Sequence, residues 1–275
     1  MQQERQENVR HASGGFFQAA DPCLSQVDEH AVNAYMVKVF GWMFLGLGVT
    51  AATTLVLLMG MGASEAFQYF VFMVIATPAI WVVFIGQFGL VMFLSARALN
   101  MNPGLAKFLF LLYAALTGLT VGIISVFISY DVTGGMGLVV TAFGLTAGSF
   151  GIMALYGYFT GKDLTGMGSL LRMALFGLII VMLVNLFLPG NGTLEILICI
   201  AGLVIFLGLT AAKTNEIKNH YARVALASTG EYRMAMGSNL DQQGLADNLA
   251  IHGALTLYLS FINIFLFILR LLARR

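Results

Sequence analysis

The residues that could do chemistry in this chain are polar side chains placed inside or beside long apolar runs. Ser260 and Asn263 lie within the apolar segment 250–272, and Gln87 and Asn185 lie within other apolar segments. An amide or hydroxyl in hydrocarbon is costly unless it finds a hydrogen-bonding partner, so such side chains usually face the interior of a helix bundle. We therefore expect Gln87, Asn185 and Asn263 to be polar contacts within a bundle rather than ligands of an ion.

The sequence predicts neither a catalytic site nor a metal or cofactor site. Its four histidines have no metal-ligand spacing: His11, His30, His220 and His252. The two cysteines, Cys23 and Cys199, are too far apart to indicate a metal cluster or a disulfide framework. No nucleophile stands beside a general base, and no glycine-rich loop is placed to cradle a phosphate. We therefore expect a protein that is not an enzyme.

These polar residues are set in a chain with the composition of a membrane protein. Of its 275 residues, 59% are hydrophobic and 10% are charged, whereas about 25% of residues are charged in soluble domains. Apolar runs of about 18 residues or more predict transmembrane helices. Seven such runs predict an all-α integral membrane protein: 34–59, 69–95, 105–129, 134–158, 169–188, 194–213 and 250–272. The net charge of +1 offers no basic patch for nucleic acid.

The distribution of Lys and Arg predicts the orientation of the helices in the membrane. Apart from three residues, the basic side chains lie at the N-terminal side or around the second, fourth and sixth connections. We therefore expect a polar cytoplasmic tail over residues 1–33 and a polar cytoplasmic connection over 214–249, with 34–275 forming one seven-helix transmembrane domain. The three exceptions follow the seventh helix: Arg270, Arg274 and Arg275. Either they lie outside against the rule or the last helix is re-entrant; we favour the first.

Glycines spaced four residues apart predict where helix backbones approach closely. Three such pairs occur: Gly118 with Gly122, Gly144 with Gly148, and Gly157 with Gly161. They predict that the helices at 105–129 and 134–158 form the most closely packed pair.

Five short segments, in order along the chain, carry a resemblance to a known family. They are YMVKVFGWM at 35–43, ALYGYFT and KDL within 154–164, VNLFL at 184–188, TNEIK at 214–218 and LYLSFINIF at 257–265. In these segments the chain resembles the Bax inhibitor-1 family, including its bacterial YccA-type membrane proteins. The resemblance covers about residues 34–272.

The resemblance implies a fold in which six helices surround a central, C-terminal seventh helix. It also implies the pH-sensitive calcium leak of many members, which is linked to two aspartates that share a proton. The YccA-type proteins further imply a location in the bacterial inner membrane and a partner, the membrane-bound AAA protease FtsH. Two functions are therefore open: a regulator that acts through protein partners, or a calcium leak channel.

At both aspartate positions this chain departs from the family motif. Lys213 stands where the aspartate that ends the sixth helix is expected, and Ser260 stands where the aspartate of the seventh helix is expected. Arg97 matches a basic position that pairs with the first aspartate in some relatives, so here it would face Lys213. The di-aspartyl pH sensor is thus lost, and we expect calcium leak to be low and flat between about pH 6 and pH 8.

Lys213 itself has more than one interpretation. The first, which we favour, is a lysine that snorkels to the headgroups while its stem packs on the bundle. The second is a fixed internal cation that holds the family's ion site shut. A Schiff-base lysine is remote, because the apolar runs offer no suitable carboxylate counter-ion. The polar segments 1–33 and 214–249 favour a regulator, embedded in the bilayer, whose partner is a protease or another membrane protein.

Overall fold

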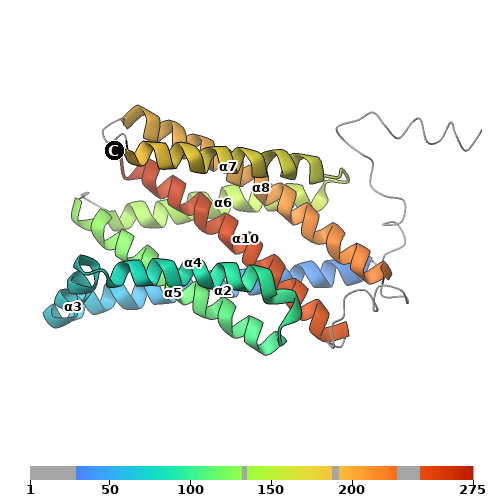
Figure 1. The fold of residues 1–275 in the computed structure, drawn as a ribbon, viewed down its shortest axis with the longest axis horizontal. Helices are drawn as coiled ribbons and strands as arrows, with labels where there is room; N and C mark the ends of the chain where they lie inside the picture. The colour runs from blue at the N-terminus through green and yellow to red at the C-terminus, as the bar shows by residue number, and fades with distance from the viewer. Residues whose placement is uncertain (1–28, 132–134, 188–191, 228–241, 275) are drawn as a thin grey trace, which may run out of the picture.

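The computed structural model describes residues 29–131, 135–187, 192–227 and 242–274, and nearly all of them are helical. Figure 1 shows the long helices gathered into one bundle. In chain order the elements are α2 (Glu29–Ala63), α3 (Glu65–Ala76), α4 (Ala79–Arg97), the short 3-10 helix η2 (Ala98–Asn100), α5 (Pro103–Asp131), α6 (Gly135–Phe159), α7 (Thr165–Phe187), α8 (Gly192–Ala227) and α10 (Gln242–Leu272).

Six helices in the described part of the chain are long and apolar enough to cross a membrane: α2, α5, α6, α7, α8 and α10. Their outer surfaces are apolar as well. Phe176 of α7 and Ile152 of α6 are each 69% exposed, for example. Because apolar side chains cover the outside as well as the inside of the bundle, the protein is an integral membrane protein in contact with lipid.

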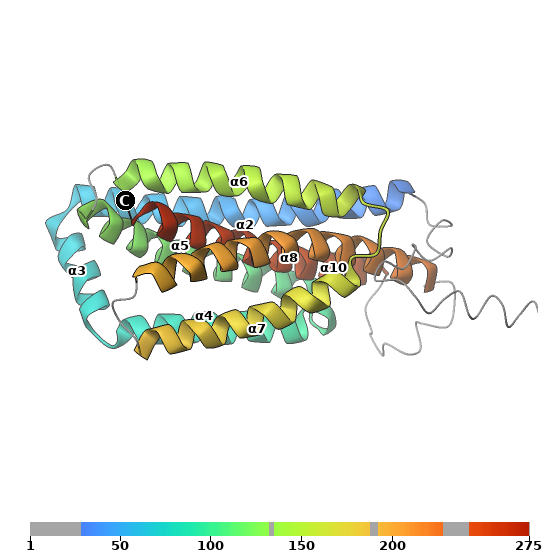
Figure 2. The same cartoon turned by 90° about the horizontal axis from the view of Figure 1, so that it is seen from above.

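The predicted second helix, 69–95, is instead two helices that meet at Thr77 and Pro78. Thr77 has an extended backbone, with φ −96° and ψ 163°. A proline ring disfavours the helical conformation in the residue before it, so α3 stops there and α4 begins afresh. Figure 2 shows α3 crossing the end of the bundle and α4 returning along it. The apolar stretch of α4, Trp81–Arg97, is shorter than the six long spans, so length alone does not yield the predicted seven.

Helices α2, α8 and α10 extend into segments predicted to be a polar tail and a polar connection. α2 begins at Glu29, inside the predicted tail 1–33, and residues 1–28 of that tail lie outside the described residues. α8 continues to Ala227 and α10 begins at Gln242, so the described residues of the predicted connection 214–249 are helical; residues 228–241 lie outside the described residues. Thr214 and Asn215, at 0% and 2% exposure, show why α8 continues: its polar residues still pack against neighbouring helices.

The core of the bundle gathers along α10. This helix contacts α2, α4, α5, α6 and α8, and Figure 1 shows it running obliquely past them. In its most apolar stretch 56% of the residues are buried, the largest share among the six spans. Leu257, Tyr258 and Ile264 are fully buried. α10 therefore positions the polar residues that face the interior.

Two pairs of helices approach at glycine. A methyl group on Gly118 of α5 would lie 2.5 Å from a backbone oxygen of α2, and one on Gly157 of α6 would lie 2.2 Å from a backbone oxygen of α8. Gly144 and Gly148 have no such neighbour within 4 Å. The prediction that α5 and α6 form the closest pair is therefore wrong, because each of them packs most tightly on a different helix.

Candidate functional site

Lys213, at the family's first sensor position, carries a charge that its own helix balances. Its ammonium nitrogen lies 3.0 Å from the Glu216 carboxylate, one turn further along α8. Arg172 of α7 lies 3.5 Å from the same carboxylate. The Lys213 side chain is 25% exposed. It is therefore one member of a partly buried ion cluster rather than an isolated charge.

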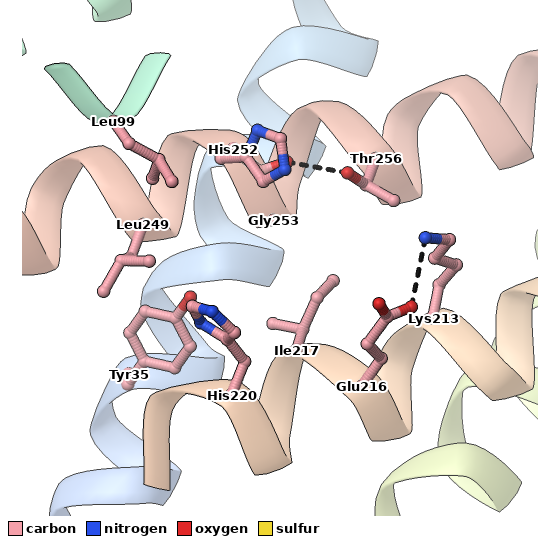
Figure 3. Close-up of a pocket in the computed structure, with 10 residues that line it drawn as sticks. All are labelled: Tyr35, Leu99, Lys213, Glu216, Ile217, His220, Leu249, His252, Gly253 and Thr256. Carbon is pink, nitrogen blue, oxygen red and sulfur yellow. Dashed lines mark hydrogen bonds and ion pairs between the residues drawn. The ribbon is translucent and has the colours of Figure 1, made fainter. Parts of the chain in front are cut away.

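Lys213 and Glu216 line one side of a cavity of about 200 Å³ between α2, α8 and α10 (Figure 3). Tyr35 of α2, His220 of α8 and His252 of α10 add a phenol and two imidazoles to its wall. The remaining lining residues are mostly apolar or small: Leu99, Ile217, Leu249, Gly253 and Thr256. A cavity of this size and polarity is large enough for several water molecules.

His252 brings a polar atom to this cavity. Its Nδ1 is buried and forms no hydrogen bond with any described residue. The Thr256 hydroxyl donates to the backbone oxygen of His252 at 2.9 Å and makes no hydrogen bond to Nδ1 of the ring (Figure 3). Burying an imidazole nitrogen without a partner is costly, so this site favours a hydrated cavity. Within the described ranges, no three His, Cys, Asp or Glu side chains form a metal-binding group.

Ser260, at the second sensor position, does not join Lys213. Its hydroxyl is buried and donates to the backbone oxygen of Thr256 on its own helix, at 3.1 Å. Thr256 is the last residue of α10 that lines the cavity, one turn before Ser260. At the two positions where the family resemblance implies carboxylates, this chain has an ion pair within α8 and a hydroxyl bonded within α10, so the two positions form no acid pair.

Two of the predicted polar contacts differ in what they join. The Gln87 amide links α4 to α5: it donates to the Thr117 hydroxyl at 2.8 Å and accepts from the Thr120 hydroxyl at 3.1 Å. The Asn263 amide donates instead to the backbone oxygen of Leu259 at 2.8 Å, one turn back on its own helix. Gln87 therefore connects helices, whereas the hydrogen bond of Asn263 stays within α10.

The other two predicted positions lie away from the cavity. Arg97 is exposed at the end of α4, and Asn185 is half-buried in the last turn of α7. Leu99 lines the cavity, but Arg97 does not. The Lys213 ammonium is paired with the Glu216 carboxylate, so repulsion by Arg97 is not the main electrostatic interaction of Lys213.

An ion bridge that the sequence does not predict lies at the start of α10. The Asp247 carboxylate is bonded to the ammonium groups of Lys38 on α2 and Lys107 on α5, the latter at 2.7 Å. Next to it, the buried Asn248 donates to the backbone oxygen of Met101 at 2.8 Å. In the sequence, an acidic residue before an apolar run is equally typical of a solvated helix end. Only the contacts with Lys38 and Lys107 show that Asp247 joins three helices.

An ion pair also connects the C-terminal end of α10 to a neighbouring helix. Arg274 forms an ion pair with Glu195 near the start of α8 and donates to the backbone oxygen of Gly192 at 2.7 Å. One of the three basic residues that break the expected charge rule is therefore neutralised by a carboxylate at its own end of the bundle. Ion pairs thus tie both ends of α10 to neighbouring helices.

Residues that carry the family resemblance meet at one end of the bundle. Asn215 of α8 accepts a hydrogen bond from the Leu164 amide at 3.2 Å and donates to the backbone oxygen of Gly157 at 3.3 Å. Lys218 donates to the backbone oxygen of Tyr158 at 3.0 Å. The TNEIK segment thus binds the end of α6 and the segment that connects α6 to α7.

Known proteins are similar in sequence to this chain over nearly its whole length. The family described as "Inhibitor of apoptosis-promoting Bax1" matches residues 32–275. The chain is 36% identical to inner membrane protein YbhL of Escherichia coli K12 over 248 residues, which cover 89% of this chain and 93% of YbhL. An uncharacterized protein of Borreliella burgdorferi is 37% identical over 243 residues, 88% and 93% of the two chains. Another, from Rickettsia prowazekii, is 33% identical over 250 residues, 90% and 92%. This helical membrane chain, in which distant family segments bind one another, therefore belongs to the Bax inhibitor-1 family.

Proposed function

We propose that this protein is a regulator in the bacterial inner membrane that binds other membrane proteins, such as the membrane-bound AAA protease FtsH, and is neither an enzyme nor a calcium channel. The charge pattern at Lys213 carries the proposal. The ammonium group is paired with Glu216, and Ser260 supplies only a hydroxyl. A calcium leak sensed by two carboxylates would need an acid pair that can titrate and offer oxygen ligands to the ion.

The proposal includes seven membrane crossings arranged around α10, with the N-terminus in the cytoplasm. α4 has 19 residues, which at about 1.5 Å per residue approach the roughly 30 Å of the hydrocarbon core. Lys38 and Lys107 meet at Asp247, close to the cavity that Lys213 lines, so these basic residues share one end of the bundle. The excess of positive charge at that end supports its placement in the cytoplasm.

The end of α8 supports a role in binding a partner. Its apolar span ends at Tyr221, but the helix continues to Ala227. His220 is exposed near this end, beside the cavity. A helix that continues past its apolar span, with the exposed His220 near its end, offers a partner a point of contact that a leak through the bundle would not require. The printed name of YbhL supports the inner membrane as the location.

A crosslinking experiment tests the partner. A photo-crosslinking residue replaces His220 in the full-length protein in its native membranes, and the matched control carries it at Phe176, on the lipid-facing side of α7. We expect a discrete protein adduct from position 220, identified by mass spectrometry, and none from position 176. Equal protein adducts at both positions, or none at 220, would contradict the proposal.

Calcium entry into dye-loaded liposomes separates the regulator from the alternative, a leak channel that has lost its di-aspartyl sensor. We expect the wild-type protein to admit little calcium, with no change between about pH 6 and pH 8. The double variant Lys213→Asp with Ser260→Asp should gain pH-dependent entry. A wild-type leak with a midpoint near neutrality would establish the channel instead.

A further inference from the structure

Helix α3 is apolar on the face that packs against the bundle. Phe67 and Val71 join a buried cluster with Leu57 of α2 and Ile123 of α5. The only charged residue of this helix, Glu65, is in its first turn. The inner face of α3 is therefore buried against α2 and α5, as expected for a packed helix.

The opposite face of α3 is apolar as well, but it is exposed. It is formed by residues spaced three or four positions apart: Ala66, Tyr69, Met73 and Ala76. Tyr69 is 73% exposed and Met73 is 57% exposed. A helix on the surface of a soluble protein would place polar residues here. The outer face of α3 therefore requires an apolar or interfacial environment.

α3 does not run with the spans. It lies nearly end-on in Figure 1 and crosses the end of the bundle from α2 towards α4 in Figure 2. Hydrogen bonds hold the turn that precedes it. The Ser64 hydroxyl accepts from the backbone N–H of Phe67 at 3.4 Å, and the side-chain amide of Gln68 donates to the backbone oxygen of Met61 at 2.5 Å. A helix set across the end of a transmembrane bundle runs along the membrane surface.

The exposed face of α3 is followed along the chain by another exposed apolar surface, in the first turns of α4. Trp81, Val82 and Ile85 in the first turns of α4 are 67%, 70% and 70% exposed. Tyr and Trp concentrate where headgroups meet acyl chains, and Tyr69 and Trp81 stand on either side of the break at Pro78. The lipid that surrounds the start of α4 is therefore the nearest apolar environment for α3.

We propose that α3 is an interfacial helix whose outer face, defined by Ala66, Tyr69, Met73 and Ala76, binds the headgroup–acyl boundary of the leaflet opposite the Asp247 ion bridge. α3 then anchors the bundle in that leaflet and sets the depth at which α4 enters the membrane. This inference rests on the position and surface of α3 and holds whether the protein is a regulator or a channel.

Depth-dependent quenching of fluorescence tests this orientation. Single-cysteine variants Tyr69→Cys, Met73→Cys and Ala76→Cys, in a full chain whose native cysteines are replaced, carry a small environment-sensitive fluorophore. They are placed in phosphatidylcholine–phosphatidylglycerol vesicles with nitroxides at shallow or deep acyl positions. We expect the shallow nitroxide to quench more, with the same shallow-to-deep ratio at all three sites. A membrane-crossing α3 would separate sites 69 and 76 by about 10 Å and change that ratio.

Variants on α4 calibrate the measurement. Val82→Cys, Ile85→Cys and Met92→Cys lie at exposed positions of a helix that runs along the bundle, so their ratios should change steadily with position. A steady change across α3 as well would overturn the proposal. Quenching of the three α3 sites by aqueous iodide but by neither nitroxide would overturn it too. So would self-quenching between labelled copies together with loss of lipid quenching, which would show a second copy covering this face.

Discussion

Asp247 is one carboxylate between two ammonium groups, and it connects α10 to both α2 and α5. Lys107 also lies over the ring of Trp42, with 5.6 Å between its ammonium nitrogen and the ring centroid. Asn in place of Asp247 would leave two neighbouring cations without a counter-charge. The Lys38 and Lys107 side chains are 40% and 32% exposed, so water reduces the penalty.

We expect Asp247→Asn to lower the free energy of unfolding by about 1–3 kcal/mol. The measurement is unfolding of the detergent-solubilised protein by a denaturing detergent. Glu65→Gln, at an exposed residue in the first turn of α3, is the matched control and should change stability by less than about 0.5 kcal/mol. If the two variants unfold at the same midpoint, the ion bridge does not stabilise the fold.

The two amides of the bundle should respond differently to the same change. Gln87→Leu removes both hydrogen bonds to α5 and should cost about 0.5–2 kcal/mol. Asn263→Leu removes a bond within its own helix and should cost less than Gln87→Leu. The same unfolding assay compares them. A larger loss for Asn263→Leu would mean that Asn263 makes the interhelical contact.

Among whole elements, α6 and α8 show how backbone contact organises the bundle. Gly157→Ala would place a methyl group 2.2 Å from a backbone oxygen of α8, which cannot move aside as a flexible side chain can. We expect it to lower the free energy of unfolding by about 1–3 kcal/mol. Gly148→Ala, on the same helix with nothing within 4 Å, should be neutral or slightly stabilising. If Gly157→Ala is as stable as Gly148→Ala, the close approach of α6 to α8 does not limit which residue position 157 can hold.

The orientation of the whole molecule can be tested from outside the cell. Ser64 precedes α3 at one end of the bundle, and His220 lies at the other end beside the cavity. We expect Ser64→Cys to react with a membrane-impermeant maleimide in intact cells and His220→Cys to react only after the membrane is opened. Labelling of position 220 in intact cells, with position 64 protected, would reverse the proposed topology.

Some features of the site could be predicted and others could not. The sequence predicts the loss of the acid pair directly, since neither Lys213 nor Ser260 carries a carboxylate. The partner of Lys213 is another matter. Glu216, one turn away, follows from helical spacing once α8 is known to continue beyond residue 213. The sequence predicts that this helix ends at residue 213, because the polar residues that follow resemble a solvated connection.

Hydropathy by itself determined that this chain is an α-helical membrane protein, because apolar length is a property of each segment alone. The family was likewise determined by short motifs in their order along the chain. Only the tertiary structure decided that Gly157 is a contact while Gly148 is exposed, and that Asp247 joins three helices. The physical reason is that lipid is as apolar as a helix interior, so hydrophobicity does not distinguish a packed face from a lipid-facing one. The break at Pro78 shows the same limit, since an apolar segment that lies across the bundle reads like one that spans the membrane.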